Sequence, residues 1–262
     1  MISPLAFVDP TAKIGRDVTI HPFAFIDKNV EIGDGCVIMP YASVMNGTRM
    51  GKNNKVYQGA IVGADPQDFR WDKNVQTFCY IGDDNTIREQ VIINRGIKAD
   101  GGTRIGNSIF FMAGSHIGHD CEIKGHSVIG NGVTMAGDVV VEEFTILSSN
   151  SVFHEKSHIG QWSLIKGGCR INGNVPPFII IAHNPVEYTG VNAFVLRRKG
   201  FKEETIDEIA KAYRHVYQSG TSVFNALKRI EADVEDIPER KQITDFIRGV
   251  GLKIVAVPVD LD

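Results

Sequence analysis

The densest cluster of side chains that could do acid–base chemistry lies in the segment GSHIGHDCEIKGH, residues 114–126. His116 and His119 are three residues apart, and Asp120 follows His119 directly. An imidazole can take up a proton near neutral pH, and an adjacent carboxylate can orient and polarise it. The pattern is that of acid–base catalysis, although a pair of surface histidines without function would look the same.

A six-residue period indicates the elements that position this cluster. An aliphatic residue or methionine returns at every sixth position from Val8 to Val62, and again from Val75 to Ile171, with Ala99 as a weak member. Short strands joined by tight corners into a triangular coil generate such a period, whereas an α-helix or an alternating strand does not. The sequence therefore predicts a mainly β fold, a parallel β-helix of hexapeptide repeats with about nine coils.

A second inward position, four residues after each aliphatic, holds small or β-branched side chains. All four cysteines fall there, namely Cys36, Cys79, Cys121 and Cys169. We therefore expect them to be reduced, buried apolar residues rather than metal ligands or nucleophiles. Glycine, asparagine and aspartate crowd the intervening positions, which is typical of sharp corners that need a positive φ.

The coil geometry relates residues that are far apart in the sequence. Three hexads make one coil, so residues eighteen apart should stack about 4.8 Å apart in a parallel sheet. Gly137 should therefore lie one coil above His119, where its N–H could stabilise an oxyanion, unless this glycine only forms a corner. The same geometry puts His126 on another face from His116. Zinc needs three converging ligands, so we expect no metal.

An apolar stripe is expected on the outside of the prism. The position before each repeated aliphatic should point outward, yet it holds apolar residues at eighteen-residue intervals: Ile92, Phe110, Val128, Ile146 and Leu164. A monomer in water does not normally leave such a surface exposed. The stripe predicts a subunit interface, with room for an acyl chain along the same surface.

Two irregular segments and a change of period divide the chain. Residues 65–74 shift the phase of the six-residue period. Residues 99–104 keep that phase but lack its usual apolar residue. Both segments therefore predict protruding loops, which often carry function. We expect the β-helix domain to span residues 1–191 and a small helical domain to span residues 192–262. Those helices could cover the open end of the solenoid.

The expected helices follow from helical spacing and capping signals. Apolar residues recur at helical spacing from Ile206 to Tyr217, before Gly220. Thr221 or Ser222 can cap a second helix that runs to about residue 234. Residue 238 is a proline, which suits the first turn of a third helix.

Composition excludes some classes of protein. The 262 residues carry a formal net charge of −3, which does not suggest a nucleic-acid binder. The first residues, MISPLAFVDP, lack the pattern of a secretory signal, and no apolar run approaches membrane-spanning length. We therefore expect a cytoplasmic protein without an integral membrane segment.

Several motifs together resemble the family of UDP-N-acetylglucosamine O-acyltransferases, whose reaction opens lipid A biosynthesis. They are QDFRW at 67–71, NRG at 94–96, HIGHDC at 116–121, NVPPF at 174–178, GVN at 190–192 and LRRKGF at 196–201. The resemblance covers essentially the whole chain. It implies a left-handed β-helix, a homotrimer with active sites between subunits, and transfer of an (R)-3-hydroxyacyl group from acyl carrier protein to the 3-hydroxyl of UDP-N-acetylglucosamine. No cofactor and no metal are implied, since the acyl donor is the phosphopantetheine thioester of the carrier protein.

The resemblance also implies roles for individual residues. His119 matches the general base, with Asp120 beside it, and Gly137 matches the oxyanion donor. The residues that match sugar and nucleotide contacts are Gln67, Asp68, Arg70, His116, His154, Asn192, Arg198 and Lys199. The basic cluster at residues 197–199 also suits an anionic diphosphate on chemical grounds. Gly167 matches a groove position where a bulky side chain would shorten the accepted acyl chain.

The sequence departs from the better-known members of that family. Asn94 and Asp138 stand where histidines are usual, Arg70 replaces a lysine, Glu155 a glutamine and Phe194 a glutamate. Whether the acceptor is the N-acetyl sugar or a 3-amino variant stays open. The alternatives are a related N-acyltransferase, which would carry an extra domain before its repeats, an acetyl-CoA-dependent acetyltransferase, and a scaffold without catalysis.

Overall fold

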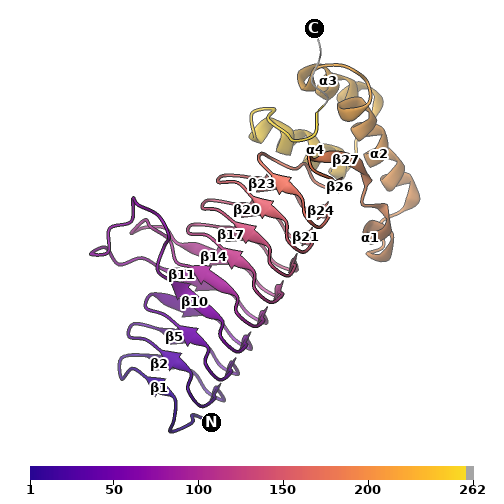
Figure 1. Cartoon of the computed structure of the whole chain (residues 1–262). Helices are drawn as coiled ribbons and strands as arrows, with labels where there is room; N and C mark the ends of the chain where they lie inside the picture. Colours follow the sequence, from indigo (N-terminus) through magenta and orange to yellow (C-terminus); the bar gives the residue numbers. More distant parts are fainter. Residues whose placement is uncertain (258–262) are drawn as a thin grey trace.

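The computed structural model describes residues 1–257 as a prism of stacked coils followed by helices (Figure 1). Three parallel sheets form the faces of the prism. The first face contains β1 (Phe7–Val8), β4 (Phe25–Ile26), β7 (Ser43–Val44), β10 (Ile61–Ala64), β13 (Ile92–Asn94), β16 (His116–Ile117), β19 (Thr134–Met135), β22 (Val152–Phe153) and β25 (Arg170–Ile171). The second contains β2 (Lys13–Ile14), β5 (Glu31–Ile32), β8 (Thr48–Met50), β11 (Cys79–Ile81), β14 (Thr103–Ile105), β17 (Glu122–Ile123), β20 (Val140–Val141) and β23 (His158–Ile159). The third contains β3 (Thr19–Ile20), β6 (Val37–Ile38), β9 (Lys55–Val56), β12 (Thr86–Ile87), β15 (Phe110–Phe111), β18 (Val128–Ile129), β21 (Ile146–Leu147), β24 (Leu164–Ile165), β26 (Ile179–Ala182) and the antiparallel β27 (Glu187–Val191).

The core runs along the axis of the prism, because the repeated aliphatic residue of each hexad points inward and is buried. Residues eighteen apart pair in register wherever the coil is regular, as Val128 does with Ile146. The four cysteines are buried, as predicted. Burial raises the pKa of the Cys79 and Cys121 thiols to about 12, which keeps them protonated and unreactive.

Two loops interrupt the coils, and their lengths decide which residues stack. The first loop, residues 65–78, makes β8 pair with β11 thirty-one positions on, as Thr48 does with Cys79. Val75 lies in this loop rather than in a strand, so the predicted restart of the period there is wrong. The second loop, residues 95–102, adds one hexad, so that Cys79 pairs with Thr103. Figure 1 shows the longer loop leaving the prism beside β10 and β11.

The second loop also corrects the predicted apolar stripe. Ile92 pairs with Ile61 and His116 on the first face, twenty-four residues before the histidine. Ile92 therefore lies outside the stripe. The coil that contains the second loop has six extra residues, so counting eighteen residues back from Phe110 reaches the first face instead of the third. The remaining members align on the third face and Ile180 extends them: Phe110, Val128, Ile146, Leu164 and Ile180. All five are only partly buried in the single chain.

The corners use more residue types than expected. Asp120 and Asp138 have φ values of 55° and 58°, as the preference of corners for aspartate predicts. Phe144 and Trp162 also adopt positive φ, and their rings stack with centroids 4.2 Å apart. Such stacking stabilises by about 0.5–1.5 kcal/mol, which offsets the backbone cost. His126 stacks on Phe144 at the corner between the second and third faces, away from His119 as expected.

The C-terminal segment forms α1 (Ala193–Arg198), α2 (Glu203–Tyr217), α3 (Val223–Asp233) and α4 (Pro238–Gly249). The three helices predicted from spacing and caps are confirmed as α2 to α4. Ser222 is the cap of α3, because its side chain accepts from the Asn225 N–H. The helices pack on the last coil through the Tyr213 hydroxyl, which donates to the Pro177 carbonyl at 2.6 Å. None of the helices in the described part of the chain has the length and apolar character needed to cross a membrane.

Glu142 ties the helices to the prism, and its removal should lower stability. Its carboxylate accepts from His158 and from Lys124, each at 2.8 Å, and the His158 ring packs on Phe246 of α4. The hydrogen bond from His158, supported by Lys124, holds the pKa of Glu142 below its ordinary value. The carboxylate therefore stabilises the fold above the unfolded pKa, and this contribution disappears as the pH falls through the folded value.

We expect Glu142→Gln to cost about 1 kcal/mol, or roughly 3 °C in melting temperature at neutral pH, and less in acid. Circular dichroism melts at neutral pH and near pH 4 measure both effects. Glu122→Gln is the matched control, since Glu122 is exposed. An equal loss for both variants, or a loss that is independent of pH, would contradict the assigned role.

Candidate active site

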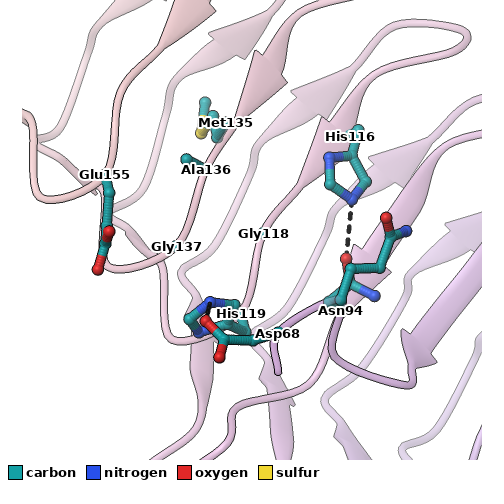
Figure 2. Close-up of a pocket in the computed structure, with 10 residues that line it drawn as sticks. Asp68, Asn94, His116, Gly118, His119, Met135, Ala136, Gly137 and Glu155 are labelled. Carbon is teal, nitrogen blue, oxygen red and sulfur yellow. Dashed lines mark hydrogen bonds and ion pairs between the residues drawn. The ribbon is translucent and has the colours of Figure 1, made fainter. Parts of the chain in front are cut away.

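A pocket of about 260 Å³ lies on the first face, at its corner with the second face. It is lined by Gln67, Asp68, Asn94, His116, Gly118, His119, Met135, Ala136, Gly137 and Glu155. Figure 2 shows the labelled residues around this pocket, with Asp68 of the first loop beside His119 and the others on successive coils. The pocket therefore gathers both predicted histidines, the predicted oxyanion donor and part of the first loop.

His119 lies between two carboxylates. Its Nδ1 is 2.9 Å from Asp120 Oδ2, and its Nε2 is 3.1 Å from Asp68 Oδ2. The Asp120 carboxylate can only accept a hydrogen bond, so it fixes a proton on Nδ1. A neutral imidazole then has its lone pair at Nε2, and this lone pair becomes available to a hydroxyl once the Asp68 carboxylate, which is also only an acceptor, moves away from Nε2. Asp68 thus occupies the position from which a substrate hydroxyl would donate to His119.

The second loop holds Asp120 in place, a contact that sequence reasoning missed. The Ile97 N–H donates to Asp120 Oδ2 at 3.0 Å. A Cβ at Gly96 would lie 2.5 Å from Asp120 Oδ1, so only a glycine lets the loop pass so close. The glycines that flank this loop were the available signal, because a close approach of two backbone segments requires them.

Gly137 lies directly above the His119 ring, as the coil spacing predicted. The Asp138 N–H donates to the His119 carbonyl at 3.0 Å, which fixes the stacking. A Cβ at Gly137 would lie 2.4 Å from both Nε2 and Cε1 of His119. Among residues 1–257 no hydrogen-bond acceptor takes the Gly137 N–H. An amide that is free beside a possible base is available for a ligand oxygen.

Arg70 holds Asp68 over the imidazole. Its guanidinium donates to both carboxylate oxygens, with Nε 2.9 Å from Oδ1 and Nη2 2.6 Å from Oδ2. The same guanidinium is 3.5 Å from Glu155, two coils above His119. The hydrogen bonds from Arg70 keep the pKa of Asp68 well below its usual range, so Asp68 stays an anion at every ordinary pH. Gln67, next to Asp68, also lines the pocket.

Comparison with known proteins identifies the family. A family model described as UDP-N-acetylglucosamine O-acyltransferase, domain 2, matches residues 174–254, and one described as the GMPPB C-terminal domain matches residues 2–100. An acyl-[acyl-carrier-protein]–UDP-N-acetylglucosamine O-acyltransferase from Stutzerimonas stutzeri is 39% identical over 250 residues, which cover 95% of this chain and 96% of that protein. The chain belongs to this acyltransferase family. A relative of the same name from Pseudomonas fluorescens is 40% identical over 255 residues, covering 95% and 98% of the two chains.

Solved structures of acyltransferases agree with this assignment. The crystal structure of a UDP-N-acetylglucosamine acyltransferase from Bacteroides fragilis superposes with a TM-score of 0.92 at 44% identity and covers 95% of this chain and 97% of its own. The enzyme of that name from Francisella novicida gives a TM-score of 0.92 at 30% identity, covering 100% and 95%. The fold is thus the left-handed parallel β-helix that was expected, and the protein is an acyltransferase.

Three residues matched to nucleotide contacts lie outside the pocket around His119 in the single chain. Asn192 is 2% exposed, and its side-chain amide donates to the Trp162 carbonyl at 2.9 Å. Arg198 and Lys199 are exposed at the end of α1, where the Lys199 ammonium is 5.9 Å from the Phe144 ring. One subunit therefore does not bring these three residues to His119, and the burial of Asn192 gives it a structural role at the start of α1.

Two further predicted residues do not line the pocket around His119. His154 follows β22, whose pairing with β19 puts it one coil above Ala136, and its side chain is exposed. Gly167 lies at the corner between the third and first faces. A Cβ there would meet only the Ser149 carbonyl oxygen, at 3.1 Å.

Proposed function

We propose that this acyltransferase moves an (R)-3-hydroxyacyl group from acyl carrier protein to the 3-hydroxyl of UDP-N-acetylglucosamine, the first step of lipid A biosynthesis. The relatives at 39% and 40% identity are named for these two substrates. The observation that carries the proposal is the His119 imidazole, bonded to Asp120 at Nδ1 and lying under the Gly137 amide. We place the reaction in the cytoplasm and assign it no cofactor beyond the carrier protein's own phosphopantetheine.

In the first step His119 acts as general base. The 3-hydroxyl of the sugar takes the place of Asp68 at Nε2 and gives its proton to that nitrogen as its oxygen attacks the thioester carbonyl carbon. Asp120 stabilises the imidazolium that forms, because its carboxylate accepts from Nδ1 at 2.9 Å. Asp68 remains paired with Arg70 and is free to accept from another sugar hydroxyl.

In the second step the tetrahedral intermediate collapses. The Gly137 N–H donates to the oxyanion, and a donor in such a position is worth about 3 kcal/mol of barrier. The carbon–sulfur bond breaks and the phosphopantetheine thiolate takes the proton from Nε2. His119 returns to its neutral state, the ester remains on the sugar, and no other reactant is needed.

The nucleotide half of the site is assigned to a second copy of the chain. Gln67, Asp68 and His116 line the pocket with the base, and Arg70 is paired with Asp68, so these four would contact the sugar. Arg198 and Lys199 carry the charge that a diphosphate requires, yet they lie at another corner of the same chain. A homotrimer with sites between subunits would complete the pocket, with His154 on the path between the sugar and the nucleotide.

The apolar stripe of the third face is the surface we assign to trimer assembly, and a charge there should break it. Val128 lies within this stripe, between Phe110 and Ile146, with which it pairs. We expect wild type to sediment as a trimer and Val128→Asp as a monomer, because a buried unpaired carboxylate costs several kcal/mol in each interface. Val140→Asp is the matched control on the second face. A Val128→Asp protein that stays trimeric would contradict this assignment.

The function is tested with purified protein, UDP-N-acetylglucosamine and 3-hydroxyacyl carrier proteins of several chain lengths, with the product identified by mass spectrometry. We expect a 3-O-acylated sugar nucleotide, and Gly167→Met should shift the preference to shorter donors. Transfer to the 3-amino sugar alone would correct the acceptor. Transfer to neither sugar would refute the proposal.

A further inference from the structure

The hydrogen bonds of Asn94 determine which nitrogen of His116 carries a proton. Asn94 is 1% exposed, and its Nδ2 donates to the Asp65 backbone carbonyl at 2.5 Å. A carbonyl can only accept, so the orientation of the amide is fixed. The amide oxygen then lies 2.8 Å from His116 Nε2. Since this oxygen also can only accept, Nε2 must be the protonated nitrogen.

We propose that Asn94 is a positioning residue that fixes His116 as the neutral Nε2–H tautomer, so that Nδ1 presents a hydrogen-bond acceptor to an N–H or O–H group of the acceptor sugar. The part that concerns the sugar rests on the proposed function. In Figure 2 the second ring nitrogen of His116 faces away from Asn94, on the side of Met135 and Ala136. The pocket therefore selects a donor at this point and rejects a carbonyl oxygen.

Arg95 anchors the base of the first loop at and before the residue that carries this carbonyl. The Arg95 guanidinium pairs with the Asp65 carboxylate at 2.5 Å and donates to the Gly63 carbonyl at 3.2 Å. It also lies over the Trp71 ring, 5.3 Å from the centroid. The hydrogen bonds thus begin at the carbonyl of a residue whose side chain and preceding backbone are anchored by Arg95.

Burial supports the neutral form of the ring. Desolvation lowers the pKa of His116. The other titratable groups that line the pocket are Asp68, His119 and Glu155, and burial rather than any of their charges causes this shift. A neutral ring has one donor and one acceptor, and the donor is already bound to Asn94.

The tautomer is tested directly in the full-length protein, labelled with ¹⁵N-histidine, by long-range ¹⁵N–¹H correlation spectra without substrate. His116→Gln assigns the signals. We expect an unprotonated Nδ1 and a protonated Nε2 in wild type at neutral pH. Asn94→Asp should protonate both nitrogens, because a carboxylate favours the imidazolium, and Asn94→Leu should give a mixture of tautomers. A wild-type ring protonated at Nδ1 overturns the proposal, whether or not the variants fold.

Kinetics test the part that concerns the sugar. A protonated Nδ1 would oppose a donor group, so we expect Asn94→Asp to raise KM for UDP-N-acetylglucosamine about tenfold, with a smaller change in kcat. Asn131→Asp, at an exposed corner, is the matched control and should behave as wild type. An unchanged KM beside the expected spectra would refute the sugar contact. Wild type that acylates no sugar would refute the proposed function, while the spectra would still decide the tautomer.

Discussion

Replacing His119 by alanine should lower kcat for acyl transfer by about 10²–10⁴-fold, the range that a general base contributes. The imidazole is the one group in the described pocket that is held at one nitrogen by a buried carboxylate and offers the other to a ligand. Asp68 cannot replace it as a base, because Arg70 keeps the pKa of that carboxyl far below neutrality. The loss should be the same for every donor chain length, because the proton comes from the sugar.

A second variant must control for loss of stability, since alanine leaves the Asp120 carboxylate without its imidazole partner. His119→Gln retains a donor for Asp120, so we expect it to be as inactive as the alanine variant and to melt close to wild type. His126→Ala removes a histidine that stacks at another corner, and it should keep near-normal turnover. Near-normal turnover of His119→Ala, measured as single-turnover product formation, would remove His119 from the mechanism.

The second large effect is expected from Gly137→Ala, which adds a single methyl group. The new Cβ would lie 2.4 Å from Nε2 and Cε1 and 3.0 Å from Nδ1 of His119. The ring cannot withdraw without stretching its 2.9 Å contact with Asp120. A displacement of about 1 Å at the reacting group is enough to cost 10²-fold in rate, and we expect at least that loss in kcat. The amide N–H itself remains, so the loss would report the position of the imidazole.

Gly173→Ala is the matched control for this substitution. Gly173 lies in the same column as Gly137, two coils above, because Met135 pairs with Phe153 and Phe153 with Ile171. A Cβ there meets only a Val255 methyl group, at 3.2 Å. We expect it to fold and turn over normally. Equal activity of Gly137→Ala and wild type would show that the glycine forms a corner and nothing more.

The period of six predicted the part of the site that is built from regular coils. Each coil repeats the backbone of the one below, so the position of Gly137 above His119 followed from counting eighteen residues. The contacts made by the two loops could not be counted in this way. Asp68 reaches His119, and Ile97 reaches Asp120, through backbone that follows no period. Family resemblance supplied Asp68, and neither the period nor the resemblance supplied Ile97.

The same counting failed wherever the coil length changed. Ile92 was placed in the apolar stripe because it lies eighteen residues before Phe110. The second loop adds six residues to that coil, so Ile92 pairs with His116 on the first face instead. Ile180 was missed because sixteen residues, rather than eighteen, separate it from Leu164. The positions of Arg198 and Lys199 relative to the His119 of another subunit depend on how subunits assemble. The repeat pattern of one chain carries no information about that assembly.

The unequal coils also indicate how a chain of this kind tolerates changes in length. An insertion of eighteen residues above Glu155 would add one layer and move the helices about 4.8 Å further from the pocket, with every column below it intact. An insertion of six residues that entered the wall between His119 and Gly137 would turn all later layers by a third of a revolution and separate these two residues. The second loop avoids this outcome because residues 95–102 carry the extra hexad outside the wall. Whole-layer duplication is thus the modular route to a longer enzyme, whereas single hexads can be added only as outward loops.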